Sequence, residues 1–242
     1  MRAHRPLPIR TKELGVFLYH TDTKPDLSTF IAIKAMKNFD LELEKIKGTE
    51  LYDHIVRTRR IYASLEEHQK NFCSGFNVHC KSGCGSCCEH FVPDITDLEA
   101  EYLEFGLLSE GRDEAVLEAV SKMNHDAPPC PLYDINNKEH HCTVYEYRPL
   151  VCRLFGAAAS KDKEGHPVFR NCKWNDNPGA EIPSQILESH KENLVVMSDY
   201  AMQLEDEEIN DTDTHLVYEA IQKAAGKVGL ILELEEAEKA GR

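Results

Sequence analysis

Eight of the nine cysteines in this 242-residue chain lie between residues 80 and 172, and this clustering constrains the fold more than any other feature. Four are close together: Cys80, Cys84, Cys87 and Cys88. The other four are widely spaced: Cys130, Cys142, Cys152 and Cys172. Metal sites made of thiolates use closely spaced ligands because short loops lose little entropy when they close. The spacing therefore predicts a metal-binding centre built from these eight cysteines.

The N-terminal segment has only a short apolar run at residues 15–19, which is too short for a signal-peptide core or a membrane span. We therefore expect a cytoplasmic chain with no membrane association. In that reducing compartment, clustered cysteines are metal ligands or redox groups more often than disulfides. A disulfide framework is the alternative that the cysteine pattern leaves open.

The chain is acidic, with 28 Lys and Arg residues against 42 Asp and Glu residues and a net charge of −14. A nucleic-acid-binding protein needs a basic surface that releases counterions from phosphates, and the sequence contains no basic run of that kind. We therefore expect no nucleic-acid partner. The sequence also lacks a Gly-rich phosphate loop, an HExxH motif and a GxSxG motif, so nothing in it indicates nucleotide hydrolysis, metalloprotease or serine-hydrolase chemistry.

Apolar residues at helical spacing predict helices on both sides of the cysteines. Gly48 is expected to end the first helix, and Thr96 with Glu99 forms the sequence pattern of a capping box. Pro183 precedes a long helical pattern, and Gly226 is expected to end the last helix, after which the C-terminus frays. Predicted helices cover residues 28–48, 51–65, 97–105, 113–123, 148–154, 184–202 and 216–225, whereas residues 1–24 form an irregular arm and the acidic residues 205–213 interrupt the C-terminal helices.

The expected fold class is mainly α, with helices flanking an irregular cysteine-rich metal-binding centre and little or no sheet. Turn residues between 130 and 175 indicate loops and one small hairpin. Three parts are predicted: an N-terminal arm and helices at 1–72, a cysteine-cluster metal-binding domain at 73–178, and C-terminal helices at 179–242 that pack on the centre.

The adjacent residues Cys87 and Cys88 are expected to point their side chains apart, so that both do not bind one ion. A multinuclear cluster or two neighbouring sites would use both thiols. Eight ligands suffice for two four-coordinate sites, or for one iron–sulfur cluster and one further site. Cys73 has no evident partner and is expected to be a free thiol.

Arg148 and Arg153 lie on either side of Cys152 in the sequence. A guanidinium offsets the negative charge of clustered thiolates and donates N–H groups to sulfur, so both arginines are candidates to surround and tune the cofactor. The alternative is that either arginine pairs with an acidic neighbour such as Glu146. Histidines close to the cysteines are further candidate ligands that eight thiols make unnecessary: His79, His90, His140 and His141, of which His90 is favoured because it follows the first four cysteines closely.

The cysteine pattern, together with CPLY at 130–133 and CTVYEYRPLVCRLFG at 142–156, resembles the YkgJ-type cysteine-cluster family, whose CxxCxxCC domain chelates zinc or iron. The resemblance covers about residues 73–175. It implies a cytoplasmic bacterial protein with an iron–sulfur or zinc centre, in a family often described as iron–sulfur oxidoreductases. A similar cysteine domain in the flagellin lysine-N-methylase is associated with a [4Fe-4S] centre, which implies a protein-modifying role by analogy.

We therefore expect a cysteine-ligated iron–sulfur centre, of the [4Fe-4S] type, in a redox or protein-modifying enzyme with a protein partner or substrate. Cys80, Cys84 and Cys87 also have the spacing of radical S-adenosylmethionine enzymes, but the alternating strands and helices of their barrel are missing. The main alternative is a noncatalytic interaction module stabilised by zinc. A metal carrier or sensor, which needs exposed thiolates, is a third hypothesis. The sequence identifies no catalytic residue.

Overall fold

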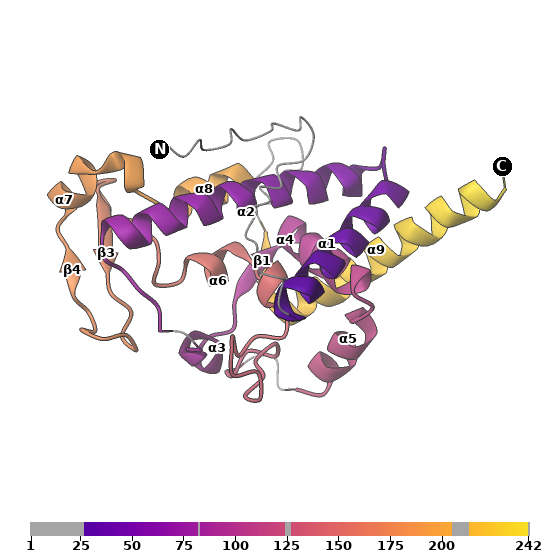
Figure 1. The fold of residues 1–242 in the computed structure, drawn as a ribbon, viewed down its shortest axis with the longest axis horizontal. Helices are drawn as coiled ribbons and strands as arrows, with labels where there is room; N and C mark the ends of the chain where they lie inside the picture. Colours follow the sequence, from indigo (N-terminus) through magenta and orange to yellow (C-terminus); the bar gives the residue numbers. More distant parts are fainter. Residues whose placement is uncertain (1–26, 82, 124–126, 205–212, 242) are drawn as a thin grey trace, which may run out of the picture.

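The structure is a computed structural model that describes residues 27–81, 83–123, 127–204 and 213–241 (Figure 1). These residues are mainly helical and contain only small sheets, so the expected fold class is confirmed. The irregular arm expected at residues 1–24 lies outside the described residues, as does the acidic segment apart from Asp213.

Four long helices contain most of the helical residues, and α4 (Asp97–Ser109) lies at their centre. It packs against α1 (Leu27–Lys45), α2 (Glu50–Gly75) and α9 (Val217–Ala240), as Figure 1 shows. Most residues of α4 are buried, because neighbouring helices cover several of its faces. The helix that follows the first cysteines is therefore in contact with helices from both ends of the chain.

The predicted capping box begins α4. The hydroxyl of Thr96 accepts a hydrogen bond from the backbone N–H of Glu99 at 3.3 Å, and the Glu99 carboxylate accepts one from the Thr96 N–H at 3.0 Å. The other Glu99 oxygen accepts from the Tyr62 hydroxyl at 3.0 Å and from the Leu150 N–H at 2.6 Å. This buried carboxylate thereby joins α2 and α4 to the start of α6 (Leu150–Leu154), the helix that carries Cys152.

Two small antiparallel sheets complete the structure. The strand β1 (Asp94–Thr96) pairs with β5 (Thr214–Leu216) and connects the start of α4 to the start of α9. The second sheet has the order β2-β3-β4, with bounds Ser160–Lys161, Pro167–Arg170 and Glu181–Ile182, so the expected hairpin gains a third strand.

The long helix predicted after Pro183 is wrong. That segment contains α7 (Ser184–Ser189), a 3-10 turn η2 (Lys191–Asn193) and α8 (Met197–Leu204). Between the last two, the backbone N–H of Ala159 donates to the Val195 carbonyl at 2.8 Å, and the Met197 N–H donates to the Ala159 carbonyl at 3.0 Å. Buried β-branched residues in an extended pairing replace the helix here, because this tertiary contact outweighs the helical pattern.

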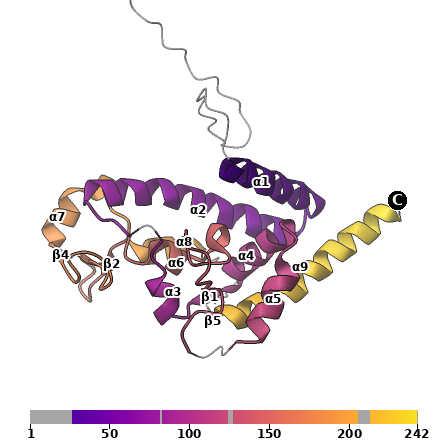
Figure 2. The same cartoon turned by 60° about the horizontal axis from the view of Figure 1, so that its bottom comes forward.

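The predicted end of the last helix at Gly226 is also wrong. α9 continues through Gly226 and Gly229 to Ala240, and its C-terminal end extends past the neighbouring helices (Figure 2). A glycine inside a helix costs about 1 kcal/mol relative to alanine. Residues that face α4 and α1 offset this cost by burial: Val217, Ala220, Ile221, Ala224, Val228 and Leu232.

The remaining helix near the predicted position 113–123 is α5 (Asp113–Ser121). α2 continues past the predicted boundary at residue 72 to Gly75, and the helices from both ends pack on α4. The division into three parts stays a prediction.

Among the described helices, none combines the length and the apolar character that crossing a bilayer requires.

Candidate metal centre

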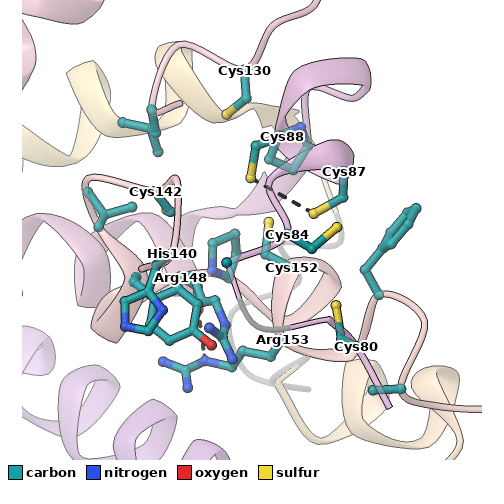
Figure 3. Close-up of a pocket in the computed structure, with 18 of the residues that line it drawn as sticks. Cys80, Cys84, Cys87, Cys88, Cys130, His140, Cys142, Arg148, Cys152 and Arg153 are labelled. Atoms are coloured by element: carbon teal, nitrogen blue, oxygen red, sulfur yellow. Dashed lines mark hydrogen bonds between the residues drawn. The ribbon is translucent and has the colours of Figure 1, made fainter. Parts of the chain in front are cut away.

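The cysteine region surrounds a cavity of about 440 Å³ (Figure 3). Seven of the eight predicted ligands line it: Cys80, Cys84, Cys87, Cys88, Cys130, Cys142 and Cys152. Cys73 also lines it, from the last turn of α2, whereas Cys172 is not among its lining residues. All nine cysteines are free thiols, so no described pair forms a disulfide.

Two glycines allow the first cysteine loop to pack closely against the second. Gly83 has a positive φ of 67°, and a Cβ atom there would lie 2.7 Å from the carbonyl oxygen of Lys138. A Cβ atom at Gly85 would lie 2.5 Å from the Cβ of His141. The short helix α3 (Ser86–His90), which carries Cys87 and Cys88, follows directly. Glycine is thus required for the approach of the two loops.

Backbone hydrogen bonds bring the later cysteines to α3. The N–H of Cys130 donates to the carbonyl of Cys88 at 2.7 Å. Tyr133 and Cys142 form an isolated antiparallel bridge, which brings Cys142 back beside the segment that follows Cys130. A 3-10 turn, η1 (Tyr145–Tyr147), then leads to α6 and Cys152.

Cys172 is held near Cys80 by a different set of contacts. The side-chain amide of Asn175 donates to the His79 carbonyl at 2.6 Å, and Lys81 Nζ lies 2.9 Å from Asp176 Oδ1. These bonds tie the residues on either side of Cys80 to those after Cys172. Burial raises the pKa of Cys80 to about 11, and negative charges on nearby thiols, including Cys172, add to this effect.

Several of the thiols resist ionisation in the absence of a cation, because burial raises their pKa. The pKa of Cys130 is raised to about 12, mainly by burial; the N–H of Leu132 acts in the opposite direction, and neighbouring thiolates make a smaller contribution that raises it. Burial also raises the pKa of Cys152, with added repulsion from Cys130 and Cys142. A bound metal cation reverses this balance, because it stabilises each coordinated thiolate. The donor set therefore fits a metal and would be unfavourable as free thiolates.

Cys87 and Cys88 do not point apart as expected, since their sulfur atoms lie 3.9 Å from each other. Two thiolates on one tetrahedral zinc ion would be about 3.8 Å apart, given Zn–S bonds of about 2.3 Å. The pair is thus close enough to bind one ion or two adjacent ones. Among the described residues, no group of three or more Cys, His, Asp or Glu side chains is placed so that it could hold one metal ion.

Arg148 faces the thiols, whereas Arg153 is held by other groups. The Arg148 Nε atom is buried and has no hydrogen-bond partner among the described residues. Its positive charge lowers the pKa of Cys87, behind the larger effect of a hydrogen bond with Cys88. Arg153 lies 2.8 Å from the Glu66 carboxylate and donates to two backbone carbonyls, so its guanidinium joins α2 to η1 and α6.

Of the four candidate histidines, His140 alone lines the cavity. His90, which the sequence favoured, has its Nδ1 2.9 Å from the Ser86 carbonyl and packs on Trp174. His79 contacts Asn77, and His141 stacks on a tyrosine. None of the four is placed among the thiols as a ligand within the described residues.

The part of α2 that contributes to the site lies beyond the helix predicted at 51–65. Gln69, Lys70 and Cys73 line the cavity from one side of this helix, and the Gln69 amide donates to the Arg153 carbonyl. Nothing in the sequence indicated that the end of α2 lies against the cysteine loops.

Comparison with known families finds the same region. Residues 79–173 match the model of the CxxCxxCC family, described as a "Putative zinc- or iron-chelating domain". The match contains all eight predicted ligands and leaves out most of the flanking helices. No curated protein and no solved structure matches the chain. Together with the thiol-lined cavity, the match supports metal binding by residues 79–173, which are similar to the zinc- or iron-chelating domain of the CxxCxxCC family.

Proposed function

We propose that the chain is an iron–sulfur protein whose centre, a [4Fe-4S] cluster, is held by cysteines of the cavity. The observation that carries the proposal is a cavity of about 440 Å³ lined by seven of the predicted ligands. A structural zinc site closes four ligands directly around one ion and leaves no space between them. A [4Fe-4S] cluster is bulkier and takes four cysteine thiolates, so it suits a thiol-lined cavity better.

The surroundings of the cavity also favour a cluster with net negative charge. The guanidinium of Arg148 lies over the Tyr145 ring, and its buried Nε atom has no hydrogen-bond partner among the described residues. The backbone N–H groups of Leu132 and Val144 act on the thiols of Cys130 and Cys142. Hydrogen bonds to sulfur and a nearby cation set the reduction potential of an iron–sulfur centre. The cluster supplies one-electron transfer, and these groups hold and tune it.

As the biological role, we propose a cytoplasmic redox or protein-modifying enzyme that acts on a protein. Exposed charged residues border the cavity, namely Lys70, Lys81 and Glu139, whereas its thiols other than Cys80 are buried or half-buried. A charged rim next to a redox centre supports a polar macromolecular substrate over an apolar small molecule. The residues outside the family match, which include α1, α7, α8 and α9, are available to bind such a partner.

The deciding experiment is iron and acid-labile sulfide analysis of the full chain purified without oxygen, together with a visible spectrum. Iron and sulfide in equal amounts, with the broad absorption band of a thiolate-ligated cluster, are expected. Stoichiometric zinc without sulfide in a colourless protein would refute the iron–sulfur assignment.

The second candidate is a noncatalytic module in which zinc stabilises the fold and the helices bind a protein. It is favoured by the 3.9 Å separation of the Cys87 and Cys88 sulfurs, which matches two ligands of one tetrahedral ion. In that case cadmium, which is also a soft divalent ion without redox activity under these conditions, should replace zinc and preserve both the fold and partner binding. Loss of partner binding on this exchange would count against the module.

A further inference from the structure

The eight predicted ligands fall into two groups that separate sets of contacts hold together. The inner group comprises Cys88, Cys130, Cys142 and Cys152. The outer group comprises Cys80, Cys84 and Cys172, and Cys87 lies between the groups. Figure 3 shows Cys88 and Cys130 at one end of the thiol-lined cavity and Cys80 away from them.

Backbone contacts fix the inner group. The Cys130 N–H donates to the Cys88 carbonyl at 2.7 Å, and the Thr143 N–H donates to the Leu132 carbonyl at 3.0 Å, so Cys142 returns beside Cys130. Cys130 is only 5% exposed. Negative charges on Cys130 and Cys142 act on both Cys88 and Cys152. These four thiols therefore lie near one another, with Cys130 buried and the other three half-buried, and Cys87 acts on all four.

Side-chain contacts fix the outer group. The Asn175 amide donates to the His79 carbonyl at 2.6 Å, Lys81 pairs with Asp176 at 2.9 Å, and the Cys84 N–H donates to the Lys81 carbonyl at 3.1 Å. These bonds hold the Cys80–Cys84 loop against the residues after Cys172. In contrast to the inner group, Cys80 is exposed.

Gly156 provides a second link between Cys172 and the rest of the domain. It has a φ of 71°, and a Cβ atom there would lie 3.3 Å from the Cβ of Cys172. Negative charges on Cys84, Cys87 and Cys172 all add to the effect of burial on Cys80. The thiols that surround Cys80 are thus the other members of the outer group and Cys87.

We propose that the domain contains two metal centres: the inner thiols hold the cluster, and Cys80, Cys84, Cys87 and Cys172 form a second, mononuclear site for a soft divalent ion such as Zn²⁺. This inference rests on the proposed metal-binding function. The outer site exchanges its ion faster than the inner one, because an exposed thiolate is open to competing ligands. With Cys87 as the fourth ligand, the two centres are adjacent at the Cys87–Cys88 peptide.

The test charges the full chain with Zn²⁺ under reducing conditions and follows release of zinc to a chelating dye. Two kinetic phases are expected for the wild-type protein. Cys172→Ser and Cys80→Ser should lose the fast phase and keep the slow one. Cys73→Ser is the matched control, because Cys73 lines the same cavity but burial is the one resolved influence on its pKa, without a neighbouring thiolate. It should keep both phases.

A single phase in the wild-type protein would overturn the proposal, as would no zinc binding at all. Loss of both phases in the two outer variants, or of neither, would also overturn it, provided that circular dichroism shows them folded. Unfolded variants would themselves contradict an exchangeable outer site. Iron and sulfide analysis tests the proposed function separately. Two zinc phases in a protein that contains no native sulfide would refute the iron–sulfur cluster but not the two groups of ligands. A native cluster that disappears in Cys172→Ser would refute the two groups of ligands but not the cluster.

Discussion

The guanidinium of Arg148 lies over the ring of Tyr145, with its Cζ atom 3.7 Å from the ring centroid. The imidazole of His140 stacks on the same ring at 3.6 Å, so the tyrosine is held between two flat groups. All three residues line the thiol cavity. A buried N–H donor that lacks an acceptor costs about 1–3 kcal/mol. An anionic metal centre, rich in sulfur acceptors, would provide the acceptor that Arg148 Nε lacks within the protein.

Replacing this guanidinium should weaken the metal centre. Arg148→Gln removes the positive charge that lowers the pKa of Cys87 and Cys142, and metal affinity should fall roughly 10- to 100-fold, as it does for groups that support metal ligands. Competition with a chelator of known affinity measures this change. If the centre is an iron–sulfur cluster, its reduction potential should also become more negative, because the lost cation favours the reduced state.

Arg170→Gln is the matched control for this variant. Arg170 pairs with Glu181 on the surface, and its side chain is 72% exposed. The same change of residue type should leave metal affinity unaltered there. Equal affinities for Arg148→Gln and Arg170→Gln would show that Arg148 does not act on the metal centre.

Arg153 should matter for stability more than for the metal. Its side chain is 4% exposed, and its N–H groups reach the Glu66 carboxylate at 2.8 Å, the Glu146 carbonyl at 2.6 Å and the Arg148 carbonyl at 2.8 Å. Arg153→Met removes the donor from two part-buried backbone carbonyls and from the Glu66 carboxylate, and should lower the free energy of unfolding by about 3 kcal/mol.

Chemical denaturation of Arg153→Met measures that loss. Glu66→Gln is the comparison, since Glu66 is 55% exposed and an amide oxygen still accepts a hydrogen bond. Its cost should be about 1 kcal/mol or less, as for other exposed ion pairs. A larger cost for Glu66→Gln than for Arg153→Met would contradict the assignment of the backbone contacts as the main contribution.

Local sequence signals predicted the parts of the fold that depend on local interactions. The capping box of Thr96 and Glu99 forms as expected, because its two hydrogen bonds join residues three positions apart. The further contact of Glu99 with Leu150 spans 51 positions and has no sequence signal. Residues 184–202 likewise show a helical pattern, yet the bridge to Ala159 breaks it, and a pairing partner that distant cannot be identified from the pattern.

The same distinction explains what was predictable about the candidate site. Close spacing indicated that Cys80, Cys84 and Cys87 belong together, whereas the separation of Cys172 from the cavity depends on the fold of the loops between them. The alternative for either arginine was an ion pair with a sequence neighbour such as Glu146, but the side chain that pairs with Arg153 is Glu66, 87 positions away on α2.

Glu104 should make the stability of the protein depend on pH. It is 1% exposed on α4, and its Oε2 atom has no hydrogen-bond partner among the described residues. Burial raises its pKa from 4.5 to about 7, with a smaller contribution from the charge of Asp113. Between these pH values the folded state keeps the proton while the unfolded state loses it. This group's contribution to the free energy of unfolding therefore falls as pH rises from 4.5 to 7, and the loss is complete above 7.

Glu104→Gln removes this titration. Chemical denaturation at a series of pH values should show the variant more stable than the wild-type protein at pH 8 by on the order of 2 kcal/mol, since a tenfold change in an acid constant is worth about 1.4 kcal/mol. At pH 4.5 the difference should be small, because the carboxyl is then protonated in the folded state. A constant difference across this range would disprove the role of Glu104.

Two glycines on neighbouring helices should respond in opposite directions to alanine. A Cβ atom at Gly106 would lie 2.4 Å from the Tyr147 ring, which is buried and donates through its hydroxyl to Glu110 at 3.0 Å. Gly106→Ala should therefore cost about 1–3 kcal/mol by overpacking. Because Tyr147 belongs to η1, between Cys142 and Cys152, metal affinity should fall as well.

A Cβ atom at Gly229 in α9 would meet no atom within 4 Å, so Gly229→Ala should raise the free energy of unfolding by about 0.5–1 kcal/mol and leave metal binding unchanged. Thermal unfolding and chelator competition on both variants check the pair, and similar stabilities would contradict the close packing of α4 on η1.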